Sequence, residues 1–313
     1  MQKIIDYLSS ELEIKNKNLL ENDIILHSLL SDLINNDYFR KNFAFKGGTC
    51  LTKCYYGYFR FSEDLDFTWI KQKDFENVSQ KEIRKILSKH ITKLGRILEE
   101  ISEKLNLNFK TEKHNKKYVE SGGSNKFTTF KLWYKSVISN REQFIKIQIN
   151  FLELFHYPFK TCKANSIVRG IDSKEFDFLF PKYAKILVTK PEISCYDIRE
   201  IITEKFRAIL TRKGVKARDF IDLFLISKKE NIDPKNLTKK ILEKTRFMLR
   251  YNKYIQNLQN FKLEKFVLGE EEKLLLTPIP RGFEKFLEKV HKLLNELAEE
   301  LMSDIKSANP STL

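Results

Sequence analysis

The sequence predicts an α+β fold with a mixed or antiparallel sheet, followed by a C-terminal helical bundle. Helical patterns come first, strands with period-two alternation occupy the middle, and only helical patterns follow residue 198. This order is typical of helices that pack on one sheet and then continue into a bundle. With 313 residues, the chain has room for one large domain or two ordinary ones. We predict a first domain over residues 1–230, including a helix pair at 198–229, and a helical bundle over 231–313.

The first third of the chain is predicted to be mainly helical. Residues 3–14 and 17–36 carry apolar side chains at helical spacing. A short strand is expected at 43–45, and another helix begins a few residues after it. Residues 65–70 have the composition of a strand, and the basic segment 79–106 has the pattern of one long amphipathic helix.

The middle of the chain is predicted to supply most of the sheet. Apolar and polar side chains alternate over 127–135 and 143–151, which predicts two strands joined by a turn. The polar segment 113–126 is expected to be a mobile loop, and a last strand is expected within 184–192. Helical patterns then occupy the rest of the chain, at 198–212, at 216–229 and from 234 to the end.

The chain carries a large excess of positive charge, with 57 Lys and Arg against 42 Asp and Glu and a net charge of +15. Such an excess is stabilised by a polyanion and favours nucleic acid or nucleotide partners. A Lys-rich, AT-biased genome gives the same composition, so the charge alone supports both interpretations equally. No apolar run is long enough for a membrane-spanning helix, and the N-terminal apolar run contains acidic residues, unlike a secretory signal.

The four cysteines lack the CxxC spacing of a zinc or redox site. They favour a reduced, cytoplasmic context, since disulfides are uncommon there. The histidines are scattered, so each is interpreted as a surface or packing residue and not as a metal ligand. The cysteines stand at positions 50, 54, 162 and 195.

The stretch "FKGGTCLTKC" places two of the chain's 10 glycines side by side, between a strand and a helix. At such a turn the backbone N–H groups of Gly47 and Gly48 can approach an anion without a Cβ in the way. Thr49 at the helix start adds a hydroxyl donor or a helix cap. A glycine pair alone is more often only a tight turn, so this motif is weak without further support.

Asp64 and Asp66 are the stronger indication, because residues i and i+2 of a strand project from the same face. Two neighbouring carboxylates repel, and a hard divalent cation relieves that repulsion; Mg²⁺ typically takes one or two carboxylates plus substrate phosphates. A solvated strand end would explain an isolated Asp-x-Asp equally well. Here the pair follows the Gly-Gly-Thr turn, and the combination favours nucleoside triphosphate chemistry with Mg²⁺ or Mn²⁺.

A second group of charges lies in "EKFRAILTRKGVKARDFIDL". Lys205 and Arg212 are two helical turns apart, and Asp219 and Asp222 are one turn apart on the next helix. Charges at these spacings are as often a solvated face with local ion pairs as a site. The functional interpretation is a cation for a triphosphate, with a carboxylate to orient it.

Together, "KGGTCLTK", "RFSEDLDF" and "EKFRAILTRKGVKARDFIDL" resemble the AbiEii/AbiGii-type nucleotidyltransferase family. This family belongs to the polymerase-β-like nucleotidyltransferase superfamily, and several members are toxins of toxin–antitoxin or abortive-infection systems. The resemblance runs from about residue 20 to 230 and agrees in the order and spacing of its motifs. The chain is also similar to a Helicobacter member with a nucleotidyltransferase domain followed by a helical bundle.

The resemblance implies a role for each motif. Asp64 and Asp66 would hold the catalytic Mg²⁺, Lys205 would contact the nucleotide phosphates, and Asp219 would belong to the Arg-Asp-x-x-Asp motif that begins at Arg218. Arg60 matches a polar position before the first aspartate less surely. The expected nucleotide-binding residues are Gly47, Gly48, Thr49, Ser62, Arg212 and Asp222.

One position departs from the superfamily pattern, in which many members place a third carboxylate on a neighbouring strand. In "FIKIQINFLE" the expected face carries Gln148 and Asn150, which supply no negative charge, and Glu153 lies further along. Either two aspartates and the phosphates hold the metal, or catalysis is impaired.

These observations predict a Mg²⁺-dependent nucleotidyltransferase that moves an NMP from an NTP to a hydroxyl acceptor. The resemblance implies RNA, with tRNA the first choice, as that acceptor, a toxin role, and an antitoxin encoded nearby as partner. The alternative is a catalytically impaired nucleotide- or RNA-binding module whose helical domain binds a protein. A metal-dependent phosphatase or nuclease ranks lowest, because no histidine cluster is evident.

Overall fold

The structure is a computed structural model that describes residues 1–122, 126–263 and 266–308. Its packing divides the chain into two compact units. The sheet unit contains Met1–Glu153, Phe159–Cys195 and Leu274–Leu276. The helical unit contains Leu154–Pro158, Tyr196–Lys273 and the chain from Thr277 onward. The packing division therefore falls near residue 195, whereas the predicted domain boundary lies at 230.

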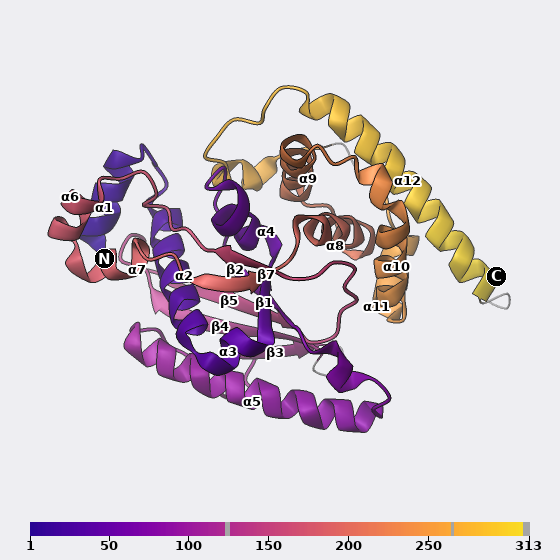
Figure 1. The fold of residues 1–313 in the computed structure, drawn as a ribbon, viewed down its shortest axis with the longest axis horizontal. Helices are drawn as coiled ribbons and strands as arrows, with labels where there is room; N and C mark the ends of the chain where they lie inside the picture. Colours follow the sequence, from indigo (N-terminus) through magenta and orange to yellow (C-terminus); the bar gives the residue numbers. More distant parts are fainter. Residues whose placement is uncertain (123–125, 264–265, 309–313) are drawn as a thin grey trace. The chain divides into compact units, whose positions relative to one another are not determined.

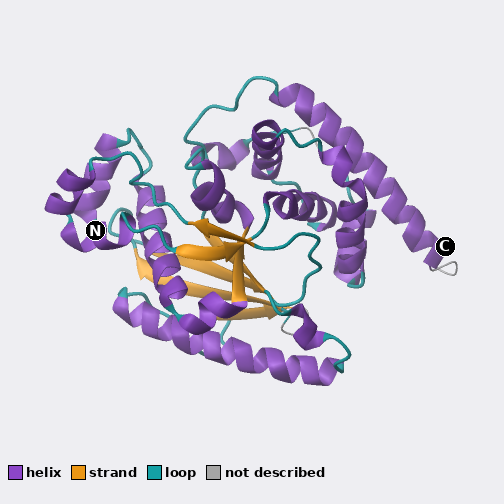
Figure 2. Ribbon diagram, viewed as in Figure 1, coloured by secondary structure: helices purple, strands orange, loops and turns teal. Residues whose placement is uncertain are grey.

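Within the described residues, one mixed sheet of seven strands forms the centre of the sheet unit, in the order β3-β4-β5-β2-β1-β7-β6 (Figure 2). The pairs β2–β5 and β1–β7 are parallel, and the other neighbours are antiparallel. The α+β prediction with a mixed sheet is thus confirmed. The strands are β1 (Phe43–Lys46), β2 (Asp64–Trp69), β3 (Val119–Gly122), β4 (Phe127–Lys135), β5 (Glu142–Asn150), β6 (Lys160–Lys163) and β7 (Glu192–Cys195).

Side-chain alternation gives the sheet one apolar and one polar face. Phe67 of β2 meets Phe39 edge-on with ring centroids 4.8 Å apart, and Trp69 lies 4.2 Å from the ring of His90. These contacts come from α3 (Asp37–Asn42) and α5 (Gln80–Lys104), which cover the apolar face. The aspartates of β2 alternate with the apolar side chains and therefore belong to the opposite, polar face.

Short polar side chains set the start of several helices. Asn16 caps α2 (Lys17–Asn35) by accepting from the Leu19 N–H, and Asn36 caps α3 in the same way. Ser79 caps α5 by accepting from the Glu82 N–H, and the Ser79 hydroxyl donates to the Glu82 carboxylate. The remaining helical segments of the sheet unit are α1 (Gln2–Glu11), α4 (Gly47–Cys50), the π-helix η1 (Leu51–Tyr56), η2 (Gln72–Phe75), α6 (Ser173–Leu179) and α7 (Pro181–Leu187).

Two sequence predictions differ from the structure. The expected strand at 184–192 is wrong over most of its length, because Pro181 at the first helical position starts α7 and the strand β7 begins only at Glu192. The expected loop at 113–126 contains β3, an edge strand too short and polar to show alternation. Residues 123–125 of that loop lie outside the described residues.

Cys162 of β6 and Cys195 of β7 are joined by a disulfide across the two neighbouring strands, with their Cα atoms 6.4 Å apart. Cys50 and Cys54 take no part in this disulfide. The expectation that the cysteines are reduced is therefore wrong for Cys162 and Cys195. The spacing did not predict the pairing, because the two residues are 33 positions apart and only the β6–β7 register brings them together.

Apart from the short segment Leu154–Pro158, the helical unit starts at Tyr196, directly after the last strand. Asp197 caps its first helix by accepting from the Arg199 N–H. Glu200 is buried and accepts from the His156 and Tyr157 N–H groups and from Lys244. The helical segments are α8 (Ile198–Thr211), α9 (Ala217–Glu230), η3 (Pro234–Leu237), α10 (Thr238–Leu249), α11 (Asn252–Gln259), η4 (Gly269–Leu274) and α12 (Phe283–Ala308). Figure 1 labels the five α-helices among them.

A buried ion pair joins η1 to α2 inside the sheet unit. Lys53 Nζ lies 2.8 Å from Asp23 Oδ1, and the Tyr58 hydroxyl donates to Asp23 Oδ2 over 2.8 Å. Both charged side chains are almost fully buried. Burial lowers the pKa of the Lys53 ammonium, and the Asp23 charge opposes this shift. The segment that follows the glycine turn is therefore anchored to α2 by a fully desolvated charge pair.

Replacement of Asp23 by Ala should destabilise the protein by about 3–5 kcal/mol, because it leaves the Lys53 charge buried without its partner. Asp6→Ala is the matched control, since its pair with Lys17 is about half exposed and should contribute far less to stability. Chemical denaturation measures both values. Similar losses for the two variants would contradict the anchoring role of the buried pair.

His27 of α2 is fully buried, and both burial and the Lys53 charge lower its pKa well below the usual value. The unfolded chain therefore binds a proton below about pH 6.5, whereas the native state does not. Stability should fall as the pH drops below that value. His27→Leu should reduce the slope by up to about 1.4 kcal/mol per pH unit. Denaturation at several pH values tests this, and an unchanged slope in the variant would refute it.

Candidate active site

The turn between β1 and α4 is built so that two charged side chains can pack directly on the backbone. Gly47 has a φ of +77°, and a Cβ at this position would collide with the Asp66 carboxylate. A Cβ at Gly48 would collide with the guanidinium of Arg60, which is itself buried and donates to the Phe61 carbonyl over 2.8 Å. Glycine is favoured at Gly47 by both the left-handed backbone and the Asp66 carboxylate, whereas at Gly48 the obstacle is the end of the long Arg60 side chain.

Thr49 connects the same turn to the start of β2. Its buried Oγ1 lies 2.5 Å from the Asp64 carbonyl oxygen and 2.7 Å from Ser62 Oγ. A hydroxyl has one hydrogen, so Thr49 can donate to the carbonyl while it accepts from Ser62. The hydroxyl that the sequence suggested as a phosphate donor or helix cap thus braces the backbone of the first aspartate.

Asp64 and Asp66 project from one face of β2, and both are half-buried. The strand register places Lys46 of β1 and Gln148 of β5 on either side of Asp66. It also places Lys146 beside Asp64. Gln148 therefore lies on the strand next to β2, as predicted. At the position where many superfamily members carry a third carboxylate, this chain has the neutral amide of Gln148.

The residues present fit a Mg²⁺ ion that completes its coordination with substrate. Among the described residues, no group of three or more His, Cys, Asp or Glu side chains is arranged to hold a metal. Mg²⁺ nevertheless needs only one or two carboxylates when phosphates and water supply its other ligands. Asp64 and Asp66 can provide those carboxylates, and the Gln148 carbonyl beside them is an uncharged oxygen donor.

Glu153 forms an ion pair with a lysine, which differs from the role of a third metal ligand. It is buried, and its carboxylate lies 2.8 Å from the Lys46 ammonium, which is buried as well. Lys46 precedes the glycine pair directly, so this ion pair fixes the end of β1 at the turn. Nothing in the sequence marked the pair, because its members are 107 residues apart.

The second predicted group forms an ion-pair network inside the helical unit. Lys205 of α8 binds both carboxylates of α9, at 3.0 Å from Asp219 Oδ1 and 2.5 Å from Asp222 Oδ2. Arg212 follows α8 and lies 2.7 Å from the other oxygen of Asp219. Lys205 and Arg212, which the sequence places two helical turns apart, thus meet at the carboxylate of Asp219.

This network is desolvated and strongly coupled. Lys205, Asp219 and Asp222 are buried, whereas the Arg212 side chain is 39% exposed. Burial raises the pKa of the Asp219 carboxyl, but the charges of Lys205 and Arg212 outweigh it and hold the pKa well below the usual value. Asp219 is therefore an anion that orients both cations.

The predicted residues thus lie in two groups. The turn, Ser62 and the two aspartates form one cluster in the sheet unit, and the Lys205 network forms the other in the helical unit. Asn150 lies further along β5, beside Thr68. Arg60 contributes a buried cation at the turn that sequence reasoning had matched only weakly.

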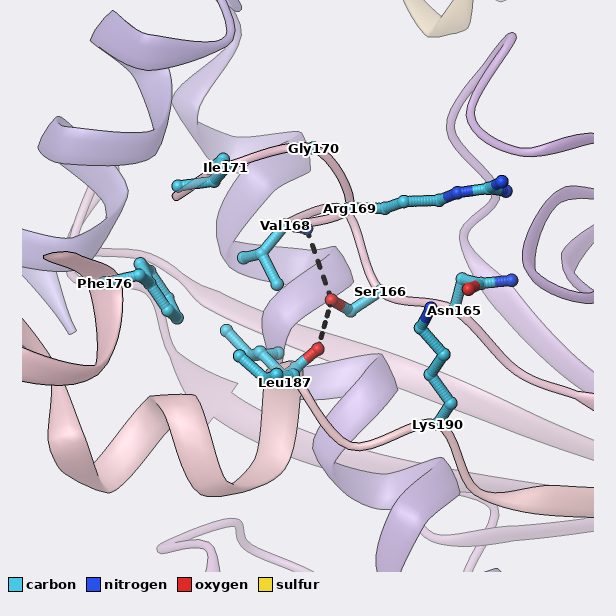
Figure 3. A pocket seen from close by; sticks show the side chains of 10 residues that line it. Asn165, Ser166, Val168, Arg169, Gly170, Ile171, Phe176, Leu187 and Lys190 are labelled. Atoms are coloured by element: carbon cyan, nitrogen blue, oxygen red, sulfur yellow. Dashed lines mark hydrogen bonds between the residues drawn. The ribbon is translucent and has the colours of Figure 1, made fainter. Parts of the chain in front are cut away.

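A cavity of about 180 Å³ lies elsewhere in the sheet unit and contains none of these residues. The Ser166 hydroxyl donates to the Leu187 carbonyl, and its oxygen accepts from the Val168 N–H (Figure 3). Apolar side chains gather on one side, whereas the chains of Arg169 and Asn165 extend the other way. Its lining residues are Asn165, Ser166, Val168, Arg169, Gly170, Ile171, Phe176, Leu187, Val188 and Lys190.

Comparison with known proteins places the chain among the nucleotidyl transferases. The sequence model of the family described as "Nucleotidyl transferase AbiEii toxin, Type IV TA system" matches residues 28–305. The chain belongs to this AbiEii family, which confirms the resemblance drawn from the motifs. No curated protein matches the sequence. None of the helices in the described ranges combines the length and apolar character needed to cross a membrane.

Two solved structures from Helicobacter pylori are similar to the chain. JHP933 has a TM-score of 0.44 and 15% sequence identity, over 94% of this chain and 97% of the other. A second protein, assigned as a nucleotidyltransferase, has a TM-score of 0.41 and 16% identity, over 91% and 97% of the two chains.

Gly47→Ala and Gly57→Ala form a matched pair that tests the contact at the turn. Both glycines have a left-handed φ, +77° and +79°, but only Gly47 has a side chain against it. Each substitution should cost about 1–2 kcal/mol of backbone strain. Gly47→Ala should cost about 1 kcal/mol more, because Asp66 must shift. Chemical denaturation measures the difference, and equal losses would show that Asp66 does not press on this glycine.

Proposed function

We propose that the protein is a Mg²⁺-dependent nucleotidyltransferase that moves an NMP from an NTP to a hydroxyl of an RNA, with tRNA the preferred class. Mn²⁺ could replace Mg²⁺. One observation carries the proposal: Asp64 and Asp66 share a strand face, and Asp66 packs on the glycine turn. Membership of the AbiEii family supports the same reaction class.

In this proposal the side chains of the sheet unit position the reacting groups. Asp64 and Asp66 would hold the metal, which when bound supplies Lewis acidity at the triphosphate. The backbone N–H groups of Gly47 and Gly48 would bind phosphate oxygens, which is a task for fixed donors that need no reorganisation. Thr49 and Ser62 would act by holding the strand start in place, since their hydroxyls bond to each other and Thr49 bonds the Asp64 carbonyl.

The Lys205 network would provide positive charge for the leaving pyrophosphate. Asp219 and Asp222 hold the Lys205 ammonium in one orientation, so little side-chain entropy remains to be lost on binding. Arg212 is the more exposed cation of the network and would reach the phosphates from its rim. This assignment includes the helix pair 198–229 in the catalytic region, and so retains 1–230 as the functional domain and 231–313 as the bundle.

The family description also supports a biological setting. We propose a toxin that acts in the cytoplasm and is neutralised by an antitoxin encoded nearby. A toxin that modifies the ends of tRNA would arrest translation, and the net charge of +15 suits a protein that binds a polyanion.

A second function is favoured by one observation. Gln148, and not a carboxylate, stands beside Asp66. A nucleotide- or RNA-binding module without catalysis would keep the turn and the aspartates while lacking a third acidic ligand. Its helical region would then serve as a protein-binding domain.

Incubation with labelled NTPs, Mg²⁺ and total RNA tests the transferase. The wild type should label RNA, and the Asp64→Ala/Asp66→Ala variant should lose at least about 100-fold, the range expected when charge stabilisation at the reacting phosphate is removed. Asp74→Ala is the control, since this carboxylate is exposed and lies outside the turn. Equal labelling by wild type and double variant would overturn the assignment.

Thermal unfolding with and without NTP separates the two functions. Binding at 100 times Kd should stabilise the protein by about 2.7 kcal/mol. Stabilisation without labelling would favour the binding module, and absence of both would exclude the two functions together.

A further inference from the structure

The polar face of the sheet carries two partly exposed aromatic rings beyond the aspartates. Trp133 of β4 and Phe144 of β5 are register partners, and their ring centroids lie 4.6 Å apart. Both belong to the same face as Asp64, because Phe144 is two residues from Lys146 on β5 and Lys146 is the partner of Asp64. We call Trp133, Phe144 and the lysines around them the aromatic platform.

Three lysines surround these rings. Lys117 Nζ lies 5.3 Å from the centroid of the Trp133 ring, and Lys131 and Lys146 lie 5.8 and 5.6 Å from that of Phe144. They come from different parts of the chain, since Lys131 is on β4, Lys146 on β5 and Lys117 just before β3. Their convergence at one place is therefore a product of the sheet register and not of a local run of charge.

The platform carries more positive than negative charge. Lys131 is paired with Glu120, and Lys117 lies 3.8 Å from Glu142. The register places Lys146 between the two rings and Asp64, and no carboxylate lies within salt-bridge distance of Lys146 in the described part of the chain. A cation in this position is available to a phosphate.

We propose that the aromatic platform binds the single-stranded end of the RNA acceptor. The proposal rests on the proposed function and names where its acceptor lies. Bases would stack on Trp133 and Phe144, a contact that every base can make because each has a π-face. Lys117, Lys131 and Lys146 would contact the phosphates between those bases.

The spacing along the strands suits this arrangement. Successive side chains on one face of a strand are about 6.6 Å apart. Phe144 is therefore about 6.6 Å from Lys146 along β5, on the face that carries Asp64. A single-stranded nucleotide repeat extends over a comparable distance. A terminal hydroxyl could therefore face Asp64 while the preceding phosphate meets Lys146 and the preceding base meets the rings. A duplex would hold its bases in its own stack and could not use the rings.

Intrinsic fluorescence gives a direct reading of stacking, because the sequence has two tryptophans and only one lies on the platform. Trp69 is 2% exposed and packed against His90, whereas Trp133 is partly exposed. The full chain, without NTP or metal, is titrated with a single-stranded RNA of about 10 nucleotides, a length within the usual range for such sites. Quenching is expected with this RNA, and much less with a blunt duplex or with heparin, which has charge but no bases.

Variants test each component of the platform by filter binding. Trp133→Leu should weaken RNA binding by about tenfold or more, and Trp133→Phe should restore it, because a phenyl ring also stacks. Lys146→Gln should lower the slope of log affinity against log salt by about 0.7, the effect of one phosphate contact to a single strand. Lys85→Gln removes the same charge from the exposed side of α5 and should change neither value.

The outcomes separate this proposal from the transferase. Quenching without RNA labelling would leave the platform in place and remove the proposed reaction. Labelling at the wild-type rate by Trp133→Leu, with unchanged affinity, would overturn the platform while the transferase stands. Equal quenching of the fluorescence by heparin would also overturn the platform proposal, because heparin has no bases. It would instead favour an acidic protein as the partner of this face.

Discussion

The register of β1, β2 and β5 is the constraint on which the rest of the sheet unit depends. It aligns Lys46, Asp66 and Gln148 in one row across three strands. A shift of one residue would turn both aspartates toward the apolar face, where Phe67 and Trp69 pack against α3 and α5. The aromatic packing on one face therefore fixes the chemistry available on the other. The burial of large rings, and not any attraction between the aspartates, holds the carboxylates side by side.

Paired charges in the interior fix the ends of the elements that carry the candidate site. In the described part of the chain, four lysines are buried, and each has a carboxylate partner: Lys46 with Glu153, Lys53 with Asp23, Lys205 with Asp219 and Asp222, and Lys244 with Glu200. Desolvation makes such pairs weak contributors to net stability, but removal of one partner is costly. They define where the glycine turn and the helix pair must sit, which suits a site that needs fixed positions more than extra stability.

The sequence was sufficient wherever local pattern determines structure. Strand-like composition predicted a strand at 65–70, where β2 lies, and strand geometry predicted that Asp64 and Asp66 share a face. Helical spacing placed Lys205 and Arg212 two turns apart, and both contact Asp219. It failed where the partner is distant or the element is short. No pattern links Lys46 to Glu153, or Cys162 to Cys195, because only the closed sheet brings them together. The strand expected at 184–192 was mostly the helix α7, since a Lys-rich apolar run fits either structure until Pro181 is recognised as its start.

The sequence left two interpretations of the glycine pair open, a tight turn and an anion-binding turn. In the structure these two interpretations are compatible. Gly47 is needed for a tight turn, because its backbone is left-handed and Asp66 occupies the space of its side chain. The same absence of a side chain brings the carboxylate against the backbone whose N–H groups could receive phosphate. A tight turn without a function would not need a charged side chain at that place, since any apolar neighbour would fill it without the cost of desolvating a carboxylate. The packing requirement therefore strengthens the functional interpretation.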